Sequence, residues 1–184
     1  FSRRQKQVYN AVLRVLRASI DGAAVGKLHR DWTKESQAHM NEELLKLGLL
    51  KPGQVKKQDP DTPACRKYFM HGLGHPLGLD VHDVGDANVP FAAGTVLTVE
   101  PGIYIPDEGF GIRLEDDILV TAEGPEVLTA AFLVDDGRVD ASRGVVARLI
   151  DGGVRVTLVV SEIEVGLCAV VGDVDLAMLV RAHG

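Results

Sequence analysis

The stretch YFMHGLGHPLGLDVHDVG, residues 68–85, concentrates much of the chain's reactive chemistry. It holds three of the six histidines within twelve residues, together with two aspartates: His71, His75, His82, Asp80 and Asp83. The spacing of His71 and His75 would suit two ligands on one helix face, but the neighbouring glycines and proline make a helix costly. A strand is therefore predicted over residues 68–75. Its period of two points His71, Leu73 and His75 to one side.

The glycines of this stretch also allow another group to come close to the backbone. They argue against the zincin class of proteases, which needs a helix with a glutamate directly after the first histidine. This chain has Gly72 at that position. The histidines therefore call for a different kind of site.

Two later stretches supply acids. In GTVLTVEPGIYI, residues 94–105, alternation puts Thr98 and Glu100 on one face, so that a carboxylate ends a strand. In GIRLEDDILV, residues 111–120, the same alternation gives Glu115 a strand position opposite to apolar neighbours. Both strands thus carry an acid where a buried apolar residue is expected.

A buried carboxylate is costly unless it is paired, hydrogen-bonded or bound to a metal. His75, Glu100 and Glu115 together predict an oxygen-rich metal site, and Arg113 shares a strand face with Glu115 and can fix its carboxylate. The alternatives are a hydrogen-bonded core cluster for the histidines and a surface acid at a strand end for Glu100.

The three motifs HGLGHPLGLDVHDVG, TVEPGIY and GIRLEDDILVT, in this order, resemble the proline-specific branch of the pita-bread metallopeptidases. That branch contains the Xaa-Pro aminopeptidases (aminopeptidase P) and the prolidases. The resemblance covers roughly residues 1–130. It implies an α+β fold with a curved, mostly antiparallel sheet and helices on one face, and a substrate peptide with proline at its second position.

The resemblance also implies residue roles. His71 and His82 would be catalytic, lying beside the metals and hydrogen-bonding the substrate carbonyl or the tetrahedral intermediate. Arg113 would support the ligands, and Tyr104 would lie near the pocket for the proline ring. Three residues would bind metal, the last of them bridging two ions: His75, Glu100 and Glu115.

Two divalent cations about 3.5–4 Å apart would activate a bridging water and polarise the scissile carbonyl. A site rich in carboxylates suits manganese, while zinc or cobalt could still bind. Family members carry two further aspartate ligands on a hairpin before the segment that resembles residues 1–20. Residues 1–130 therefore resemble the C-terminal half of the catalytic domain, with three of five expected ligands. The chain alone is expected to bind a dinuclear centre poorly and to be inactive or nearly so.

A second class of function is a catalytically inactive pita-bread domain that binds other proteins. The presence of His75, Glu100 and Glu115 favours the enzyme, because a protein-binding module has no reason to keep three metal ligands. Residues upstream of Phe1 would discriminate the two, since two aspartates on a hairpin would support the enzyme. A homodimer is an expectation that rests on the family alone.

The amino-acid composition bears on further classes of protein. The chain has 184 residues, 46% of them hydrophobic, and a formal charge of −6, which gives no electrostatic footprint for nucleic acid. No apolar run is long enough to span a membrane. The two cysteines, Cys65 and Cys168, imply no disulfide framework and favour a cytoplasmic location. No targeting segment is visible after Phe1.

Two helices precede the histidine stretch. Residues 2–20 carry one apolar stripe behind a possible Ser2 cap, and a second helix is predicted over about 25–47. His29 and His39 in the second helix are interpreted as ordinary helix histidines. Residues 51–64 are predicted to be an exposed loop. The predicted strands then form one mostly antiparallel sheet: 68–75, 95–100 and 111–120.

Residues 131–184 differ from the rest because they contain no Lys, Pro, Asn, Gln, Tyr or Trp. Alternation over residues 154–160 permits a strand, and residues 173–182 could be helical. A genuine extension, a small interaction module and a translated wrong reading frame are all open, and the compositional break favours the last.

Overall fold

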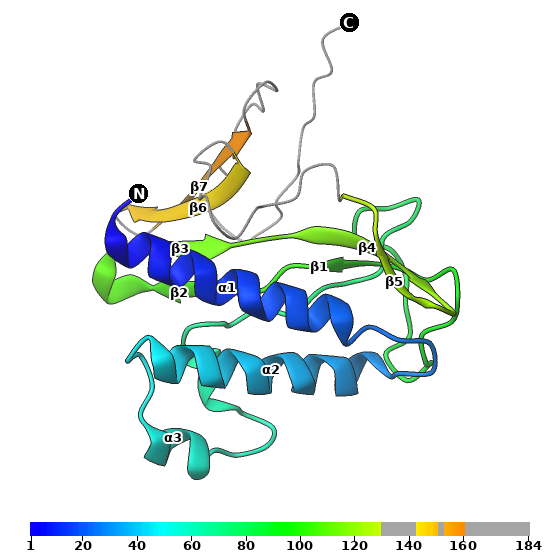
Figure 1. Cartoon of the computed structure of the whole chain (residues 1–184), viewed down its shortest axis with the longest axis horizontal. Helices are drawn as coiled ribbons and strands as arrows, with labels where there is room; N and C mark the ends of the chain where they lie inside the picture. The colour runs from blue at the N-terminus through cyan, green and yellow to red at the C-terminus, as the bar shows by residue number, and fades with distance from the viewer. Residues whose placement is uncertain (130–142, 151–152, 161–184) are drawn as a thin grey trace, which may run out of the picture.

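The computed structural model describes residues 1–129, 143–150 and 153–160. Its helices are α1 (Arg3–Asp21), α2 (His29–Lys46) and α3 (Pro52–Lys56), with 3-10 turns η1 (Ala64–Lys67) and η2 (Pro106–Glu108). Its strands are β1 (Val96–Val99), β2 (Gly102–Ile105), β3 (Phe110–Arg113), β4 (Asp116–Thr121), β5 (Gly124–Val127), β6 (Arg143–Ile150) and β7 (Gly153–Val160). Figure 1 shows helices and antiparallel strands in one body, as an α+β fold requires. Among these helices, none has the length and apolar character needed to cross a membrane.

Helix α1 begins and packs as its sequence predicts. The Ser2 hydroxyl accepts a hydrogen bond from the Gln5 N–H (3.1 Å), and the Gln5 side chain accepts one from the Ser2 N–H (2.8 Å). This reciprocal cap satisfies donors that a helix N-terminus leaves free. The predicted apolar stripe is buried along its whole length: Val8, Val12, Val15, Leu16 and Ile20.

Helix α2 starts at His29, four residues later than predicted, because the chain before it forms a turn at Gly26 with a φ of 87°. Its inner face buries Trp32 completely. The Trp32 indole N–H donates to the Ser19 carbonyl of α1 at 2.7 Å, which ties the two helices together. The predicted stop at Gly48 is confirmed by its left-handed φ of 73°.

The prediction of a loop over residues 51–64 is wrong in part, because α3 occupies Pro52–Lys56. Pro52 stands in the first turn of this helix, where its missing N–H costs nothing and its fixed φ suits the helical conformation. None of the residues of α3 is buried, so the segment is nevertheless exposed.

The prediction of one sheet is also wrong. The strands form two antiparallel sheets, with the orders β1-β4-β5 and β2-β3-β6-β7. β1 pairs with β4 as far as Val99 and Asp116, and β2 pairs with β3 from Gly102 and Arg113 onwards. Two residues on each arm therefore separate the ladders, and the register continues across the gap. Pro101 lies in this gap and has no N–H to donate to a ladder.

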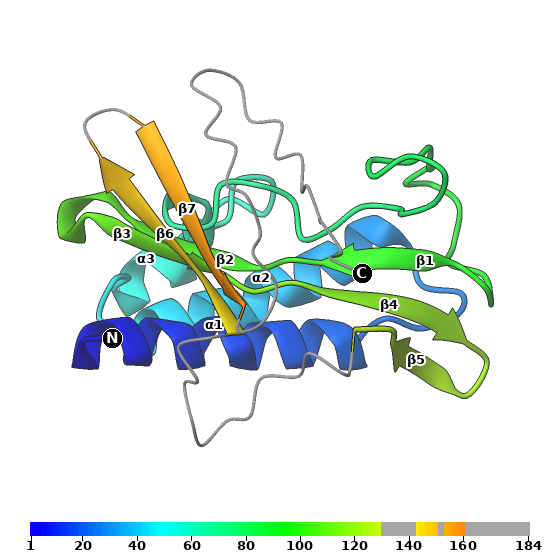
Figure 2. The same ribbon diagram turned by 90° about the horizontal axis from the view of Figure 1, so that it is seen from above.

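We call β1, β2, β3 and β4 the double hairpin. Figure 2 shows β3 running on into β4, with β1 and β2 beside them. Helix α1 contacts β1, β2, β3 and β5, and α2 packs on α1 and η1. The core lies between these helices and the double hairpin. Its largest fully buried side chains include Trp32, Phe69, Met40, Leu44, Leu73, Leu97, Ile103 and Ile112.

The strand predicted over residues 68–75 does not form. The segment is extended and follows β1 with isolated hydrogen bonds, from the Thr98 N–H to the His75 carbonyl (2.9 Å) and from the Glu100 N–H to the Leu73 carbonyl (2.8 Å). Its one β-bridge joins Pro76 to Leu97. No continuous ladder forms, because Pro76 has no N–H to donate and the His75 N–H donates to the Thr98 hydroxyl, although the Leu77 N–H still donates to the Val96 carbonyl at 3.2 Å.

Beyond residue 129, the strand predicted from alternation over residues 154–160 is confirmed by β7. β7 pairs with β6, and β6 pairs with β3, both antiparallel. The helix predicted over residues 173–182 lies outside the described residues.

Candidate metal centre

Glu100 and Glu115 are brought together by the register of the double hairpin. Each lies in the gap between the two ladders, so Glu100 stands directly opposite Glu115. Arg113 holds both carboxylates: its Nη1 lies 3.2 Å from Glu100 Oε2, and its Nη2 lies 3.0 Å from Glu115 Oε2. Like charges placed opposite each other on paired strands repel unless a cation offsets them. The hairpin therefore builds a site that demands positive charge.

His75 completes this cluster from the neighbouring segment. Its Nδ1–H donates to the Pro76 carbonyl at 2.8 Å, which leaves Nε2 as the free position of the ring. Nε2 lies 3.4 Å from Glu100 Oε1. In the neutral imidazole both atoms are acceptors, so a proton or a cation between them is needed to make the approach favourable. This arrangement suits a metal ligand whose other nitrogen is fixed by the backbone.

Thr98 connects the two donors and was not predicted as a site residue. Its hydroxyl accepts a hydrogen bond from the His75 N–H (3.0 Å) and donates one to Glu100 Oε1 (3.3 Å). Only 2% of Thr98 is exposed. The sequence carried a signal, because alternation places Thr98 on the same face as Glu100.

His71 contacts Tyr104 instead of the carboxylates. The His71 Nδ1–H donates to the Gly72 carbonyl at 2.8 Å, and the Tyr104 hydroxyl donates to Nε2 at 3.0 Å. Burial lowers the pKa of His71, and burial raises the pKa of Tyr104 to about 12. Both groups are therefore neutral near pH 7, and Tyr104 lies beside His71 at the edge of the site.

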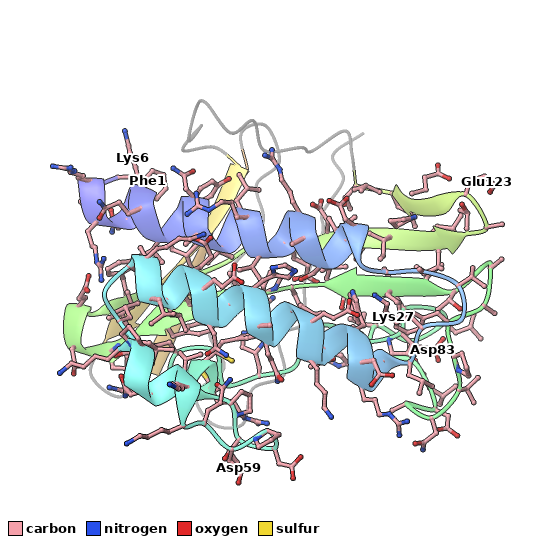
Figure 3. The ribbon with its side chains drawn as sticks, turned by 60° about the horizontal axis from the view of Figure 1, so that its bottom comes forward. Phe1, Lys6, Lys27, Asp59, Asp83 and Glu123 are labelled. Atoms are coloured by element: carbon pink, nitrogen blue, oxygen red, sulfur yellow. The ribbon has the colours of Figure 1, made fainter. Side chains whose placement is uncertain are left out.

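His82 approaches from the segment that follows Pro76, residues 77–90, which we call the histidine loop. The rings of His82 and His75 have centroids 4.4 Å apart and meet edge to face. The loop is exposed, and two of its apolar side chains have almost no cover: Leu79 is 104% exposed and Val84 is 91% exposed. In Figure 3, Asp83 of this loop lies at the same end of the molecule as Lys27, just before α2.

Three consecutive acids, Glu115, Asp116 and Asp117, all have a raised pKa. Burial raises the pKa of Glu115, Arg113 opposes that shift, and Glu100 adds to it. Burial also raises the pKa of Asp116 and Asp117, although Asp116 accepts a hydrogen bond from the Thr129 hydroxyl at 2.6 Å. Crowded carboxylates with raised pKa values are typical of sites that bind a cation or a proton.

The predicted residues are thus brought together in two groups. One group holds the proposed donors and their arginine: His75, Glu100, Glu115 and Arg113. The other pairs His71 with Tyr104, while the His82 ring meets that of His75 edge to face. In the part of the chain that the structure describes, no three His, Cys, Asp or Glu side chains converge closely enough to hold a metal ion by themselves.

Arg113 accounts for the lack of a converging set of ligands, because its guanidinium pairs with both the Glu100 and the Glu115 carboxylate. The donor chemistry nevertheless fits a divalent cation: one imidazole with its Nδ1 anchored, and two opposed carboxylates, are the nitrogen and oxygen ligands that such ions take. An antiparallel hairpin that presents opposed acids beside a histidine-rich loop defines a candidate metallohydrolase site.

Comparison with known proteins places the chain in a family. The sequence model described as "Metallopeptidase family M24" matches residues 1–122. The chain therefore belongs to metallopeptidase family M24, whose members use divalent metals.

Its relatives include Xaa-Pro aminopeptidase from Escherichia coli (strain K12), which is 42% identical over 153 residues covering 77% of this chain and 34% of that protein. Xaa-Pro aminopeptidase 3 from Homo sapiens is 35% identical over 141 residues, covering 71% of this chain and 27% of that protein. This chain thus spans about a third of the length of the curated relatives that it matches.

Solved structures show the same fold. Zinc-substituted E. coli aminopeptidase P in complex with product matches with a TM-score of 0.65 and 38% identity, covering 77% of this chain and 34% of that one. Pseudomonas aeruginosa aminopeptidase PepP matches with a TM-score of 0.65 and 35% identity, covering 77% and 35%. The described body is therefore part of a pita-bread fold, as the motifs predicted.

Proposed function

We propose that this chain supplies the C-terminal half of the catalytic domain of a metal-dependent aminopeptidase that hydrolyses the N-terminal Xaa-Pro peptide bond. The observation that carries the proposal is the position of Glu100 opposite Glu115, with His75 Nε2 3.4 Å from Glu100 Oε1. A protein-binding domain has no need of two opposed acids, whose repulsion must be offset by the Arg113 cation. Membership of family M24 and the similarity to Xaa-Pro aminopeptidases support the same activity.

In this proposal His75, Glu100 and Glu115 hold two divalent cations together with two aspartates from outside residues 1–130. Manganese is the proposed ion, because oxygen ligands dominate the set, and zinc or cobalt are the alternatives. Divalent cations bound at such a site supply Lewis-acid activation of water and of the scissile carbonyl. Arg113 orients both glutamates through its two terminal nitrogens.

His71 and His82 are the proposed substrate-contacting residues. The neutral state that burial favours for His71 leaves its imidazole able to exchange the Tyr104 hydrogen bond for one to a substrate group. His82 is exposed on the histidine loop, where a peptide can reach it. Tyr104 is proposed to lie near the ring of the substrate proline. A cytoplasmic location and a homodimer are proposed on the cysteine content and on the family, respectively.

Metal binding by the chain tests the donor set. Mn²⁺ is titrated while its electron paramagnetic resonance signal is followed, for the wild type and for Glu100→Gln, Glu115→Gln and His75→Ala. We expect weak binding by the wild type and loss of binding in each variant. Glu123→Gln is the matched control, because Glu123 is an exposed acid in the turn between β4 and β5 (Figure 3). Binding that survives substitution of both Glu100 and Glu115 would refute the site.

Activity is tested in a chimera in which this chain replaces the matched third of E. coli Xaa-Pro aminopeptidase. We expect the chimera with Mn²⁺ to release the first residue of an Xaa-Pro peptide. Glu100→Gln should lower the rate more than about 100-fold, since loss of residues that merely support metal ligands already costs about 10–100-fold. The isolated chain should show little or no turnover. A folded chimera that binds Mn²⁺ without turnover would favour the protein-binding alternative.

A further inference from the structure

We propose that His29 and Thr98 are positioning residues that hold the His75 imidazole and the Glu100 carboxylate in one fixed relation. The proposal deepens the proposed function, because it concerns the residues behind the metal donors. It rests on a continuous set of hydrogen bonds that runs from α2, through the backbone at Gly74 and His75, to Glu100.

His29 provides the anchor on the helix side. It is the first residue of α2, and its Nε2–H donates to the Gly74 carbonyl at 3.0 Å. The ring is held edge to face by Trp32, with centroids 5.5 Å apart, and by Phe91 at 6.2 Å. Because Trp32 is fully buried and Phe91 nearly so, the His29 imidazole lies against the core. Its hydrogen bond therefore ties the Gly74 carbonyl to the packed side of the molecule.

Gly74 is held from the other side by β1. A Cβ at Gly74 would overlap the Thr98 carbonyl oxygen, so the backbone of this segment lies against the strand without room for a side chain. The peptide between Gly74 and His75 is thus fixed at both ends, because its carbonyl accepts from His29 and its N–H donates to the Thr98 hydroxyl. Only glycine allows this approach.

Thr98 links the His75 backbone to the Glu100 carboxylate. Its single hydroxyl proton is given to Glu100 Oε1 at 3.3 Å, while its oxygen accepts from the His75 N–H at 3.0 Å. The Thr98 side chain therefore fixes the distance between the His75 backbone and the Glu100 carboxylate. A buried hydroxyl at this position is satisfied only if both groups stay in place.

These tethers matter because few packed side chains hold the chain beyond Pro76. The histidine loop is attached by the His82 ring beside His75 and by backbone hydrogen bonds from Leu77 to Val96 and from Asp83 to Pro76, both 3.2 Å, while Leu79 and Val84 are almost completely exposed. Ligand geometry must be held within a fraction of an ångström for a metal site to work. We infer that the hydrogen bonds from His29 and Thr98 replace the packing that the loop lacks.

The test uses two matched pairs of variants in the whole chain. Thr98→Val removes the hydroxyl and keeps the shape, and Thr98→Ser keeps the hydroxyl. His29→Phe removes the donor and keeps the aromatic packing, and His29→Gln restores a donor near the position of Nε2. If one variant of a pair fails to fold by circular dichroism, the other pair decides.

Two readouts separate positioning from general stability. The first is hydrogen exchange of the His75 amide by NMR, compared with core amides such as that of Val12. The second is the concentration of Mn²⁺ that broadens the His75 imidazole signals. We expect Thr98→Val and His29→Phe to raise the His75 exchange rate about 10-fold or more, with core amides unchanged, and to raise the Mn²⁺ concentration required by about 10-fold. Thr98→Ser and His29→Gln should stay close to the wild type.

The outcomes distinguish this proposal from the proposed function. If Glu100→Gln abolishes the Mn²⁺ effect while Thr98→Val and His29→Phe leave both readouts unchanged, the positioning role is refuted and the metal site stands. If Thr98→Val mobilises His75 but Mn²⁺ acts equally on wild type and Glu100→Gln, positioning stands and the metal site is refuted. Equal impairment of Thr98→Ser and Thr98→Val would also refute the role of the hydroxyl.

Discussion

The double hairpin and the histidine loop meet at one site but are held in place by different means. The hairpin is covered by α1, and its side chains reach the core, where Ile103 and Ile112 are fully buried. The loop has exposed apolar side chains, and individual hydrogen bonds tie the segment before it to β1. The acids are thus positioned by packing that the whole fold shares, and the imidazoles by a few local contacts. Changes in the core should therefore act on stability, and changes near the loop on site geometry.

The largest effect is expected for Trp32→Ala, which changes the core between the helices and the double hairpin. The change removes a fully buried side chain and leaves the Ser19 carbonyl without its donor. Large-to-small substitutions of buried aromatics cost about 3–5 kcal/mol. Urea denaturation should show a loss of this size, and a loss below about 1 kcal/mol would show that α2 contributes little to the shared core.

Gly74→Ala tests the boundary between the two regions, with Gly72→Ala as its control. A Cβ at Gly74 meets the Thr98 backbone, whereas one at Gly72 has no atom within 4 Å. Overpacking of this kind costs about 1–3 kcal/mol. We expect Gly74→Ala to lose this much in denaturation and to displace the His75 NMR signals, while Gly72→Ala is neutral. Equal behaviour of the two variants would show that the segment before the histidine loop does not depend on close approach to β1.

Glu43→Gln examines an ion pair on the packed side. Burial alone would raise the pKa of Glu43, but hydrogen bonds from Arg14 (2.6 Å) and Lys46 (2.8 Å) outweigh it and lower that pKa below its ordinary 4.5. The carboxylate therefore stabilises the fold above pH 4.5, and this contribution is lost as the pH falls through the lowered value. We expect Glu43→Gln to cost about 1 kcal/mol at pH 7. The difference from wild type should vanish in acid; a difference that persists there would exclude the charge as its cause.

The smallest effect is expected for Leu79→Ala in the histidine loop. Leu79 is fully exposed, and surface substitutions usually change stability by less than about 0.5 kcal/mol. The denaturation midpoint should not move. A clear loss would mean that the loop is packed in solution and that the two regions are held in place by similar means.

Local patterns predicted the parts of the fold that depend on local physics. The cap at Ser2 and the stripe of α1 follow from neighbouring residues, and both are confirmed. The strand over residues 68–75 and the single sheet were wrong because alternation records which side a residue faces, and not whether a partner strand can bond to it. Pro76 and Pro101 were visible signals that a ladder would be interrupted.

The site was predicted to the extent that acids and imidazoles stand out from an apolar pattern. The meeting of Glu100 with Glu115 follows from hairpin register, which alternation can suggest. The anchor from His29 to Gly74 joins residues 45 positions apart, and no local pattern marks it. His29 was interpreted as an ordinary helix histidine for that reason, and the sharing of one hydroxyl between His75 and Glu100 could not be seen without coordinates.

The register of the double hairpin determines whether the two acids stay opposite each other. Because Glu100 and Glu115 sit on opposite arms, the number of residues between each acid and the turn at residues 106–109 must match. Deleting one residue from a single arm slides every cross-strand partner by one place and moves the acids apart. Deleting one from each arm keeps them face to face. Natural length variation in this hairpin is therefore expected to come in balanced pairs, or within the turn itself.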